Sequence, residues 1–249
     1  MLEAEFVARV EAAGGHAFAV GGWVRDFLRG EQPEDKDYVV TGMDAVSFEA
    51  AFPEGKLIGR AFPVFLLPIE ADGGRGDRQC EVAMARRERK EGSGYRGFVA
   101  EADSSITIED DLYRRDLTIN SMALDLHEGR LVDPYGGQAD IADRVLRPVS
   151  EHFGEDPVRA LRAARFAARL GYAPAPELLA AMGMNTAIAK EYFSGKKGNS
   201  GDKESALETY CMDLTQMARD GLRIFDASRA PSAPPAPMIV WISSIKRST

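Results

Sequence analysis

Two neighbouring stretches, Val20-Gly21-Gly22-Trp23-Val24-Arg25-Asp26 and Asp35-Lys36-Asp37-Tyr38-Val39-Val40, decide how the first part of this chain folds. The apolar runs around them are typical of strands over 16–20 and 37–41, with a helix between them that starts near Trp23 and ends at Leu28. Residues two apart on a strand point to the same side, so Asp35 and Asp37 are expected to present both carboxylates to one face. The stretches therefore predict a strand, a glycine turn, a helix and a second strand that begins at paired acids.

A further helix and two further strands are expected around this unit. The apolar residues of 2–13 recur at helical spacing, and Gly14-Gly15 ends that segment. Strand-like segments at 64–69 and 79–84 are separated by a glycine-rich turn at 72–77, which predicts a hairpin. The order of these elements favours a small mixed sheet with helices against it, which is an α+β fold.

The next part of the chain has weaker patterns. Residues 86–97 are charged and glycine-rich, and we expect a mobile loop there. Strand-forming segments follow at 114–125 and 130–133, around a turn at His127-Glu128-Gly129.

The strongest helix prediction covers 156–170. Asp156 suits the N-cap, Pro157 suits the first helical position, and Gly171 ends the helix. Four arginines fall within roughly a 120° arc of this helix. Nothing acidic lies between Val158 and Leu170 to pair with them, so they require phosphates or carboxylates from elsewhere. These arginines are Arg159, Arg162, Arg165 and Arg169.

Composition limits the class of protein. The chain has 249 residues, of which 45% are hydrophobic and 28% charged, as in globular proteins with a real core. A formal charge of −8 argues against coating nucleic acid or an anionic membrane by bulk charge, and leaves a local basic site open. No apolar run approaches the roughly 20 residues that span a bilayer, so we expect no membrane partner.

Cysteine and histidine usage points to a cytoplasmic protein without a zinc cluster. Cys80 and Cys211 are too far apart in sequence to form a disulfide framework, which suggests a reducing compartment. The N-terminus is acidic, unlike that of a signal peptide. With three histidines and no His/Cys cluster, any metal is expected to be held by carboxylates.

The acids of the first segments suit a magnesium site. Asp35 and Asp37 offer the oxygen ligands that Mg²⁺ prefers, and such sites leave positions for substrate phosphates. Glu81 lies in an apolar strand and is expected to point away from Val82. A two-metal nucleotidyl transfer needs about three carboxylates. Taken alone, Asp35-Lys36-Asp37 also fits a solvated turn, and Glu81 an exposed residue of an edge strand.

Glycines and arginines in the same region suit phosphate binding. The pair Gly21-Gly22 lets backbone amides approach phosphate oxygens at a helix N-terminus. Arg25 adds a cationic donor on the first helical turn. Arg114-Arg115 either clamps a triphosphate, with Asp116 accepting a hydrogen bond from a ribose hydroxyl, or is a surface cluster.

Taken together and in this order, the segments resemble the class II tRNA nucleotidyltransferases (CCA-adding enzymes) and the related bacterial poly(A) polymerases. The resemblance covers about 16–172, whereas 182–249 look like no part of the family. Residues 60–65 and the loop at 92–95 are closer to the CCA-adding branch. The matching segments are 20–26, 35–40, 59–65, 81–86, 92–98, 114–120, 133–137 and 153–162.

The resemblance implies a polymerase-β-type nucleotidyltransferase head domain over 1–148. It further implies the start of a helical neck with the base-recognition helix over 149–185, and a divergent, irregular and flexible tail is expected over 186–249. The implied activity is Mg²⁺-dependent addition of CCA to tRNA 3′ ends from CTP and ATP without a nucleic-acid template. The alternatives are a poly(A) polymerase, a partial CC- or A-adding enzyme, and a truncated nucleotide-binding remnant without productive tRNA binding. A dinucleotide-binding oxidoreductase fits poorly, because the glycine pair lacks the Gly-x-Gly-x-x-Gly spacing.

The resemblance also implies roles for individual residues. Asp35 and Asp37 would ligate Mg²⁺, and Glu81 would be the third catalytic carboxylate. Asp116 would contact the ribose, and Asp156 with Arg159 would read the incoming base. The full set of implied nucleotide-binding residues is Gly21, Gly22, Arg25, Arg115, Asp116, Asn120, Asp156, Arg159, Arg162 and Arg165.

Overall fold

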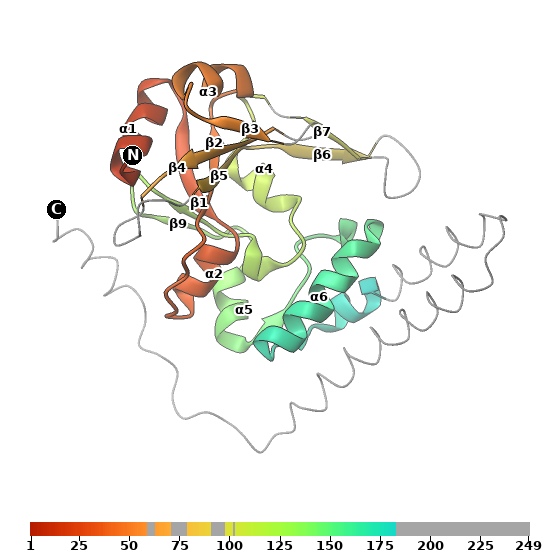
Figure 1. Ribbon diagram of the computed structural model, residues 1–249. Coiled ribbons are helices and arrows are strands. Elements are labelled where there is room, and N and C mark those ends of the chain that lie inside the picture. The colour runs from red at the N-terminus through yellow and green to blue at the C-terminus, as the bar shows by residue number, and fades with distance from the viewer. Residues whose placement is uncertain (59–62, 71–78, 91–97, 102, 183–249) are drawn as a thin grey trace, which may run out of the picture.

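A seven-stranded mixed sheet forms the centre of the molecule (Figure 1). The computed structural model describes residues 1–58, 63–70, 79–90, 98–101 and 103–182. The strands of the sheet are β1 (His16–Val20), β2 (Asp37–Thr41), β3 (Lys56–Ile58), β4 (Val64–Pro68), β5 (Gln79–Met84), β8 (Ala123–Asp125) and β9 (Leu131–Val132). They are ordered β3-β4-β5-β2-β1-β8-β9, with β2 and β5 parallel and the other neighbours antiparallel.

Helices and two small ribbons complete the described part of the chain. In Figure 1, α1 and α3 lie at one end of the molecule, and α5 and α6 lie at the other. None of the helices in the described ranges is both long and apolar enough to span a bilayer. The helices are α1 (Glu3–Ala12), α2 (Gly22–Leu28), α3 (Ala45–Ala51), α4 (Ile108–Tyr113), α5 (Gly137–Asp143) and α6 (Pro157–Leu170), with 3-10 turns η1 (Thr118–Asn120) and η2 (Glu151–Glu155). The ribbons pair β6 (Arg87–Lys90) with β7 (Phe98–Glu101) and β10 (Val145–Leu146) with β11 (Ala173–Pro174).

The two faces of the sheet are covered by different helices. Tyr38 belongs to the core that α1 and α3 form with the sheet, whereas Val39 belongs to the core that includes α4. Side chains alternate along a strand, so Asp37 shares the α4 face with Val39. Glu81 has the same orientation on β5, because its neighbour Val82 is buried in the α1 and α3 core. The acids of β2 and β5 therefore emerge on the face that α4 partly covers.

A second core joins α6 to the end of the head. The helix begins as predicted: the Asp156 side chain accepts a hydrogen bond from the backbone N–H of Val158. It ends at Gly171, which adopts a φ of 66° that favours glycine. The buried face of α6 combines Phe166 with small residues that let the helix pack closely, namely Ala160, Ala163, Ala164 and Ala167.

Several sequence-based predictions are confirmed. Strands β1, β2 and β5 have the predicted bounds, and β4 pairs antiparallel with β5 as a hairpin requires. The turn between β8 and β9 lies where it was predicted. Helix α6 also lies within the range predicted for it. Three predicted segments lie outside the described residues: the turn at 72–77, residues 91–97 of the loop predicted over 86–97, and the tail at 186–249.

Two predictions are wrong. Residues 87–90 were expected in a loop but form β6, because β7 on the far side of the glycine-rich segment supplies its hydrogen-bond partners. Residues 114–125 were expected to be mostly strand, but only 123–125 pair in the sheet. The segment before β8 forms η1 instead, with the Thr118 N–H donating to the Arg147 carbonyl from beyond β9. Both errors arise from partners that are distant in sequence.

Candidate active site

Three carboxylates gather at the start of β2 and on β5. Asp35, Asp37 and Glu81 are all exposed, and the pairing of Tyr38 with Val82 sets Asp37 beside Glu81. Although the Asp37 residue is exposed, partial burial of its carboxyl group raises its pKa, and the negative charges of Glu81 and Asp35 raise it further. The positive charge of Arg115 lowers the pKa against these effects. The predicted acids therefore influence one another electrostatically.

The donor set of these acids suits a hard divalent cation. Carboxylate oxygens are the protein ligands that Mg²⁺ prefers. Within the described ranges, no three His, Cys, Asp or Glu side chains converge closely enough to form a ready-made metal site. The fit rests instead on charge: after burial, the negative charges of Glu81 and Asp35 also raise the pKa of Asp37, and a cation would relieve that repulsion.

The glycine turn lies next to these acids. Val20 pairs with Asp37, so the turn that follows β1 is adjacent to the start of β2. Gly21 is buried and has a φ of 70°, in the left-handed region. A Cβ atom at this position would lie 3.2 Å from Nη1 of Arg115. Glycine is therefore required both by the backbone and by the approach of Arg115.

Arg25 is buried and fully engaged by protein partners. Its residue is 3% exposed, and its Nε and Nη2 atoms donate to Asp26 at 2.8 and 2.6 Å. Its Nη1 atom donates to Oδ1 of Asn120 at 2.7 Å. The arginine that the sequence suggests for phosphate binding thus joins α2 to η1.

Asp116 continues this connection to α6. It is 6% exposed, and its Oδ1 atom accepts hydrogen bonds from the Leu117 N–H at 2.9 Å and from Asn120 at 3.4 Å. Its Oδ2 atom accepts from Nε of Arg162 at 2.6 Å. A chain of polar contacts therefore runs from Arg25 through Asn120 and Asp116 to Arg162.

Arg114 and Arg115 share a buried partner that the sequence analysis missed. Asp111 of α4 is 0% exposed and accepts hydrogen bonds from both guanidinium groups. Burial raises the pKa of Asp111, but the positive charges of Arg115 and Arg114 outweigh that effect and lower it overall. The i,i+3 and i,i+4 spacings were a signal for these pairs.

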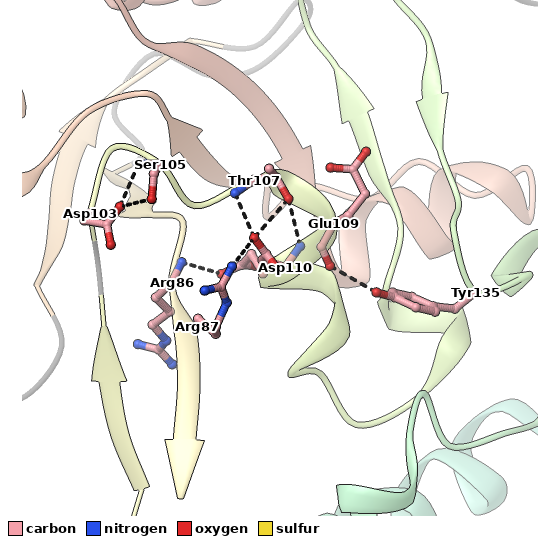
Figure 2. Close-up of polar contacts among 9 residues, drawn as sticks. Arg86, Arg87, Asp103, Ser105, Thr107, Glu109, Asp110 and Tyr135 are labelled. Atoms are coloured by element: carbon pink, nitrogen blue, oxygen red, sulfur yellow. Dashed lines mark hydrogen bonds and ion pairs between the residues drawn. The ribbon is translucent and has the colours of Figure 1, made fainter.

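The start of α4 is fixed by its own polar contacts (Figure 2). Thr107 and Asp110 form a capping box, in which each side chain accepts from the other residue's backbone N–H. Arg87 of β6 donates to Asp110 at 2.8 Å, and the Tyr135 hydroxyl donates to the Glu109 carbonyl at 3.1 Å. These contacts connect the first turn of α4 to β6 and to the segment after β9.

The predicted base-reading residues lie where α6 begins. Asp156 caps the helix, and Arg159 is half-buried. Nη2 of Arg159 donates to the backbone carbonyl of Arg114 at 2.9 Å. Arg159 therefore connects the predicted neck helix to the segment that carries Arg115.

Phe166 is a second residue that the sequence analysis missed. It is 5% exposed, and its ring centroid lies 5.2 Å from the guanidinium carbon of Arg25, 5.9 Å from that of Arg162 and 5.5 Å from that of Arg165. Its position one helical turn after Arg162 was the available signal. The ring supports the arginine cluster between α2 and α6.

The contacts thus bring most predicted residues into one region. Asp37, Glu81, Gly21 and Arg115 form one part, and Asp35 acts on it through its charge. Arg25, Asn120, Asp116 and Arg162 form the other. Arg165 is exposed beside Phe166 at the margin. Carboxylates facing a cluster of arginines can hold a cation and a polyphosphate side by side.

The chain is similar to known proteins over much of its length. The family described as Poly A polymerase head domain matches residues 17–147. A multifunctional CCA protein of Xanthomonas campestris pv. campestris (strain B100) is 51% identical over 168 residues, which cover 66% of this chain and 38% of that protein. The corresponding protein of Xylella fastidiosa (strain M23) is 50% identical over 169 residues, covering 67% and 38%. This chain spans about 38% of the length of these curated relatives.

Solved structures show the same similarity. The crystal structure of the Bacillus stearothermophilus CCA-adding enzyme in complex with CTP has 27% sequence identity and a TM-score of 0.63. The match covers 88% of this chain and 49% of that one. A tRNA nucleotidyltransferase complexed with a primer tRNA and an incoming ATP analog has 25% identity and a TM-score of 0.57, covering 89% and 63%.

Proposed function

The chain belongs to the poly A polymerase head domain family, and from that premise we propose that it is a Mg²⁺-dependent nucleotidyltransferase that adds C, C and A to tRNA 3′ ends. The substrates are CTP, ATP and a tRNA that lacks its 3′ CCA. Its curated relatives are named multifunctional CCA proteins, and similar solved structures hold CTP or a primer tRNA with an ATP analog. The reducing compartment that the cysteines favour agrees with a cytoplasmic site of action.

The position of Arg115 is the observation that carries this proposal. One guanidinium nitrogen of Arg115 lies beside the Gly21 turn, and its charge acts on Asp37, which neighbours Glu81. A nucleoside triphosphate needs a cationic group beside a carboxylate-held metal, because its phosphates carry charge that both must neutralise. An arginine between a glycine turn and paired acids meets that need.

The proposed reaction is attack of the tRNA 3′-hydroxyl oxygen on the α-phosphorus of the incoming nucleotide. The new bond joins that oxygen to the α-phosphorus, and the bond to the β-phosphate breaks to release pyrophosphate. Mg²⁺ bound by Asp35 and Asp37 would supply Lewis-acid stabilisation of the phosphate charge. Glu81 adds negative charge that strengthens cation binding at Asp37.

The remaining residues are proposed to hold the nucleotide. Gly21 and Gly22 leave room for the triphosphate beside Arg115. Arg25 and Asn120 support Asp116, whose carboxylate would exchange its contact with Arg162 for the ribose hydroxyl. Asp156 and Arg159 would offer hydrogen-bonding groups to cytosine or adenine, and Arg162 and Arg165 would line the same pocket. Positioning and charge neutralisation, rather than covalent catalysis, would accelerate the transfer.

The test is to incubate the full chain with Mg²⁺, CTP, ATP and a tRNA transcript lacking CCA, and then to sequence the 3′ ends. The Asp35→Ala variant, purified in the same way, controls for a contaminating enzyme. We expect CCA at the 3′ end with the wild-type chain and no addition with the variant. A parallel reaction without Mg²⁺, to which Mg²⁺ is then added back, tests the metal requirement separately.

Other outcomes would change the assignment. Runs of A would indicate a poly(A) polymerase, and CC or A alone would indicate a partial enzyme. Equal activity in wild type and Asp35→Ala would contradict the assignment of this site. If the chain binds Mg²⁺–CTP but extends no tRNA, it binds nucleotides without transferring them, and the proposed transfer activity is overturned.

A further inference from the structure

We propose that Asp111 is a positioning residue of the nucleotide site, which orients the guanidinium group of Arg115 toward the glycine turn. The proposal rests on the proposed function, because that function gives Arg115 a triphosphate to bind. Asp111 itself touches no part of the proposed substrate path: its side chain is completely buried beneath the two arginines.

The contacts of Asp111 are divided evenly between the two arginines. Its Oδ2 atom accepts from Nε and Nη2 of Arg115 at 3.3 and 2.9 Å. Its Oδ1 atom accepts from Nε and Nη2 of Arg114 at 3.0 and 2.7 Å. Each guanidinium therefore presents the same edge to one carboxylate oxygen. Charge-assisted hydrogen bonds of this kind fix orientation as well as position.

This arrangement determines which edge of Arg115 faces the site. The Nε and Nη2 atoms are directed to Asp111, so Nη1 is on the opposite side of the planar group. That Nη1 atom lies 3.2 Å from where a Cβ atom of Gly21 would be. Asp111 thus sets the direction in which Arg115 offers a donor.

Asp111 is itself fixed by the structure around it. Its Oδ1 atom accepts from the backbone N–H of Arg86 at 3.3 Å, two residues after the end of the strand that carries Glu81. The helix that carries Asp111 packs on the sheet, where Ile108 and Leu112 of α4 share a core with Val39 of β2. The anchor of Arg115 is therefore tied to the same sheet as the carboxylates.

A fixed anchor matters because of the neighbouring negative charges. An arginine side chain has several rotatable bonds and seeks carboxylates. Without Asp111, Arg115 would be drawn toward Asp37 and Glu81, where it would oppose a cation instead of binding phosphate. The buried carboxylate outcompetes the exposed ones, because a charge pair is stronger away from water.

The test compares Asp111→Asn with Asp110→Asn in steady-state assays with CTP and ATP. Asp110 is the adjacent acid on the same helix, and its contacts are with Thr107 and Arg87 rather than with Arg115. We expect Asp111→Asn to raise KM for both nucleotides by about tenfold, the effect of losing one charge-assisted hydrogen bond to phosphate, with a smaller change in kcat. Asp110→Asn should leave KM within about twofold of wild type. Equal KM values in all three chains would overturn the proposal.

A double-variant cycle separates positioning from a general structural role. Arg115→Lys keeps the charge but loses the planar group that Asp111 orients. If Asp111 acts through Arg115, the double variant should have nearly the same KM as Arg115→Lys alone. Fully additive changes in KM would show that Asp111 acts by another route and would contradict the inference.

The Asp111→Glu variant covers the case in which Asp111→Asn does not fold. It retains the negative charge but moves the carboxylate by one methylene, so it should fold and shift Arg115. A thermal unfolding midpoint close to wild type with a raised KM supports the proposal. An unchanged KM in the folded variant overturns it.

Equilibrium binding of Mg²⁺–CTP distinguishes failure of the inference from failure of the proposed function. If wild type binds Mg²⁺–CTP but transfers nothing, the proposed function fails, and weaker binding by Asp111→Asn than by Asp110→Asn still supports the positioning role. Equal binding by both variants overturns that role. A wild-type chain that does not bind Mg²⁺–CTP overturns both proposals.

Discussion

The acidic side and the basic side of the candidate site are held in opposite ways. Asp37 and Glu81 are exposed at the start of β2 and on β5, and burial together with neighbouring negative charge raises the pKa of Asp37. Arg25 is almost completely buried and donates to Asp26 and Asn120. The acids carry a local excess of negative charge, whereas the basic groups are paired within the protein.

This difference shows what each side contributes before a ligand arrives. Repulsion among the acids favours a cation, because a cation lowers the electrostatic energy of every carboxylate near it. The paired arginines gain less from an added anion, but their geometry is already set when the protein folds. In the proposed function, the acidic side would supply affinity for metal, and the basic side would supply a preorganised shape.

Asp37→Asn is expected to have the largest effect. Removing one carboxylate that is proposed to bind the metal should reduce nucleotide incorporation by at least about a thousandfold, because a bound metal supplies several kcal/mol of charge stabilisation. Incorporation of radiolabelled CTP into tRNA at saturating Mg²⁺ measures this effect. Asp44→Asn provides a matched control just beyond the far end of the same strand, where asparagine can still cap α3. Comparable loss in both variants would contradict a specific role for Asp37.

Arg25→Ala tests the basic side, through stability. It leaves buried Asp26 without its closest partner, and breaking a buried ion pair costs about 3 kcal/mol of unfolding free energy. Arg29→Ala, one turn later on the same side of Asp26, should cost less than about 1 kcal/mol, because Arg29 is more exposed. Urea unfolding of both chains measures the difference. Equal midpoints would show that burial of Arg25 contributes little.

Arg159→Ala tests whether the start of α6 takes part in base selection. The ratio of kcat/KM for CTP to that for ATP should change by about tenfold, the effect of losing one or two hydrogen bonds to a base. KM for the nucleotides should change less than this ratio. Arg169→Ala removes an exposed arginine from the same helix and serves as the control. An unaltered ratio in Arg159→Ala would refute the base-reading role.

The smallest expected effects are opposite changes in stability for Asp37→Asn and Asp110→Asn. Asp37 has a raised pKa when folded, so its contribution to stability is present at low pH and is lost as pH rises through that pKa. Replacing it should make the chain at least as stable as wild type at pH 7. Burial raises the pKa of Asp110, but the hydrogen bond from Arg87 and the contacts of Thr107 outweigh that effect and lower it overall. Its contribution is therefore present above the ordinary pKa, about 3.9, and is lost as pH falls through the folded value.

Asp110→Asn should accordingly be less stable than wild type at pH 7, by no more than about 1 kcal/mol, the usual limit for an exposed ion pair. Both differences from wild type should shrink as pH falls: that of Asp37 begins to shrink below its raised folded pKa, and that of Asp110 disappears only below its lowered folded pKa. Thermal unfolding from pH 3 to pH 7 measures the two trends. Variants that shift in the same direction at pH 7 would contradict the contrast between the two sides.

Local patterns were sufficient for the elements that form from neighbouring residues. Strands β1 and β2 and the capped helix α6 have sequence signals within their own segments, and all three are where those signals predict them. Asp35 and Asp37 are two residues apart in sequence, so they are close together although β2 begins only at Asp37. Glu81 joined them because β5 pairs with β2, which is a tertiary event.

Long-range contacts account for what the sequence analysis missed. Strand β6 forms because β7 pairs with it, and no local pattern in 87–90 indicates that partner. Phe166 has the pattern of an ordinary core residue, and only the packing of α6 against α2 brings its ring to Arg25. Asp111 has helical spacing to Arg114 and Arg115, but its burial depends on α4 packing against the sheet.

By itself, the sequence determined the strand and helix segments of the head, the chemical types of the site residues and the family to which they belong. The tertiary structure alone decided which charges are buried, which arginines are paired and which edge of Arg115 is presented. The physical reason is that hydrogen-bonding periodicity and capping act over a few residues, whereas burial and charge pairing depend on every segment that packs nearby. The candidate acids can thus be identified from spacing, while the preorganised arginines exist only in the folded chain.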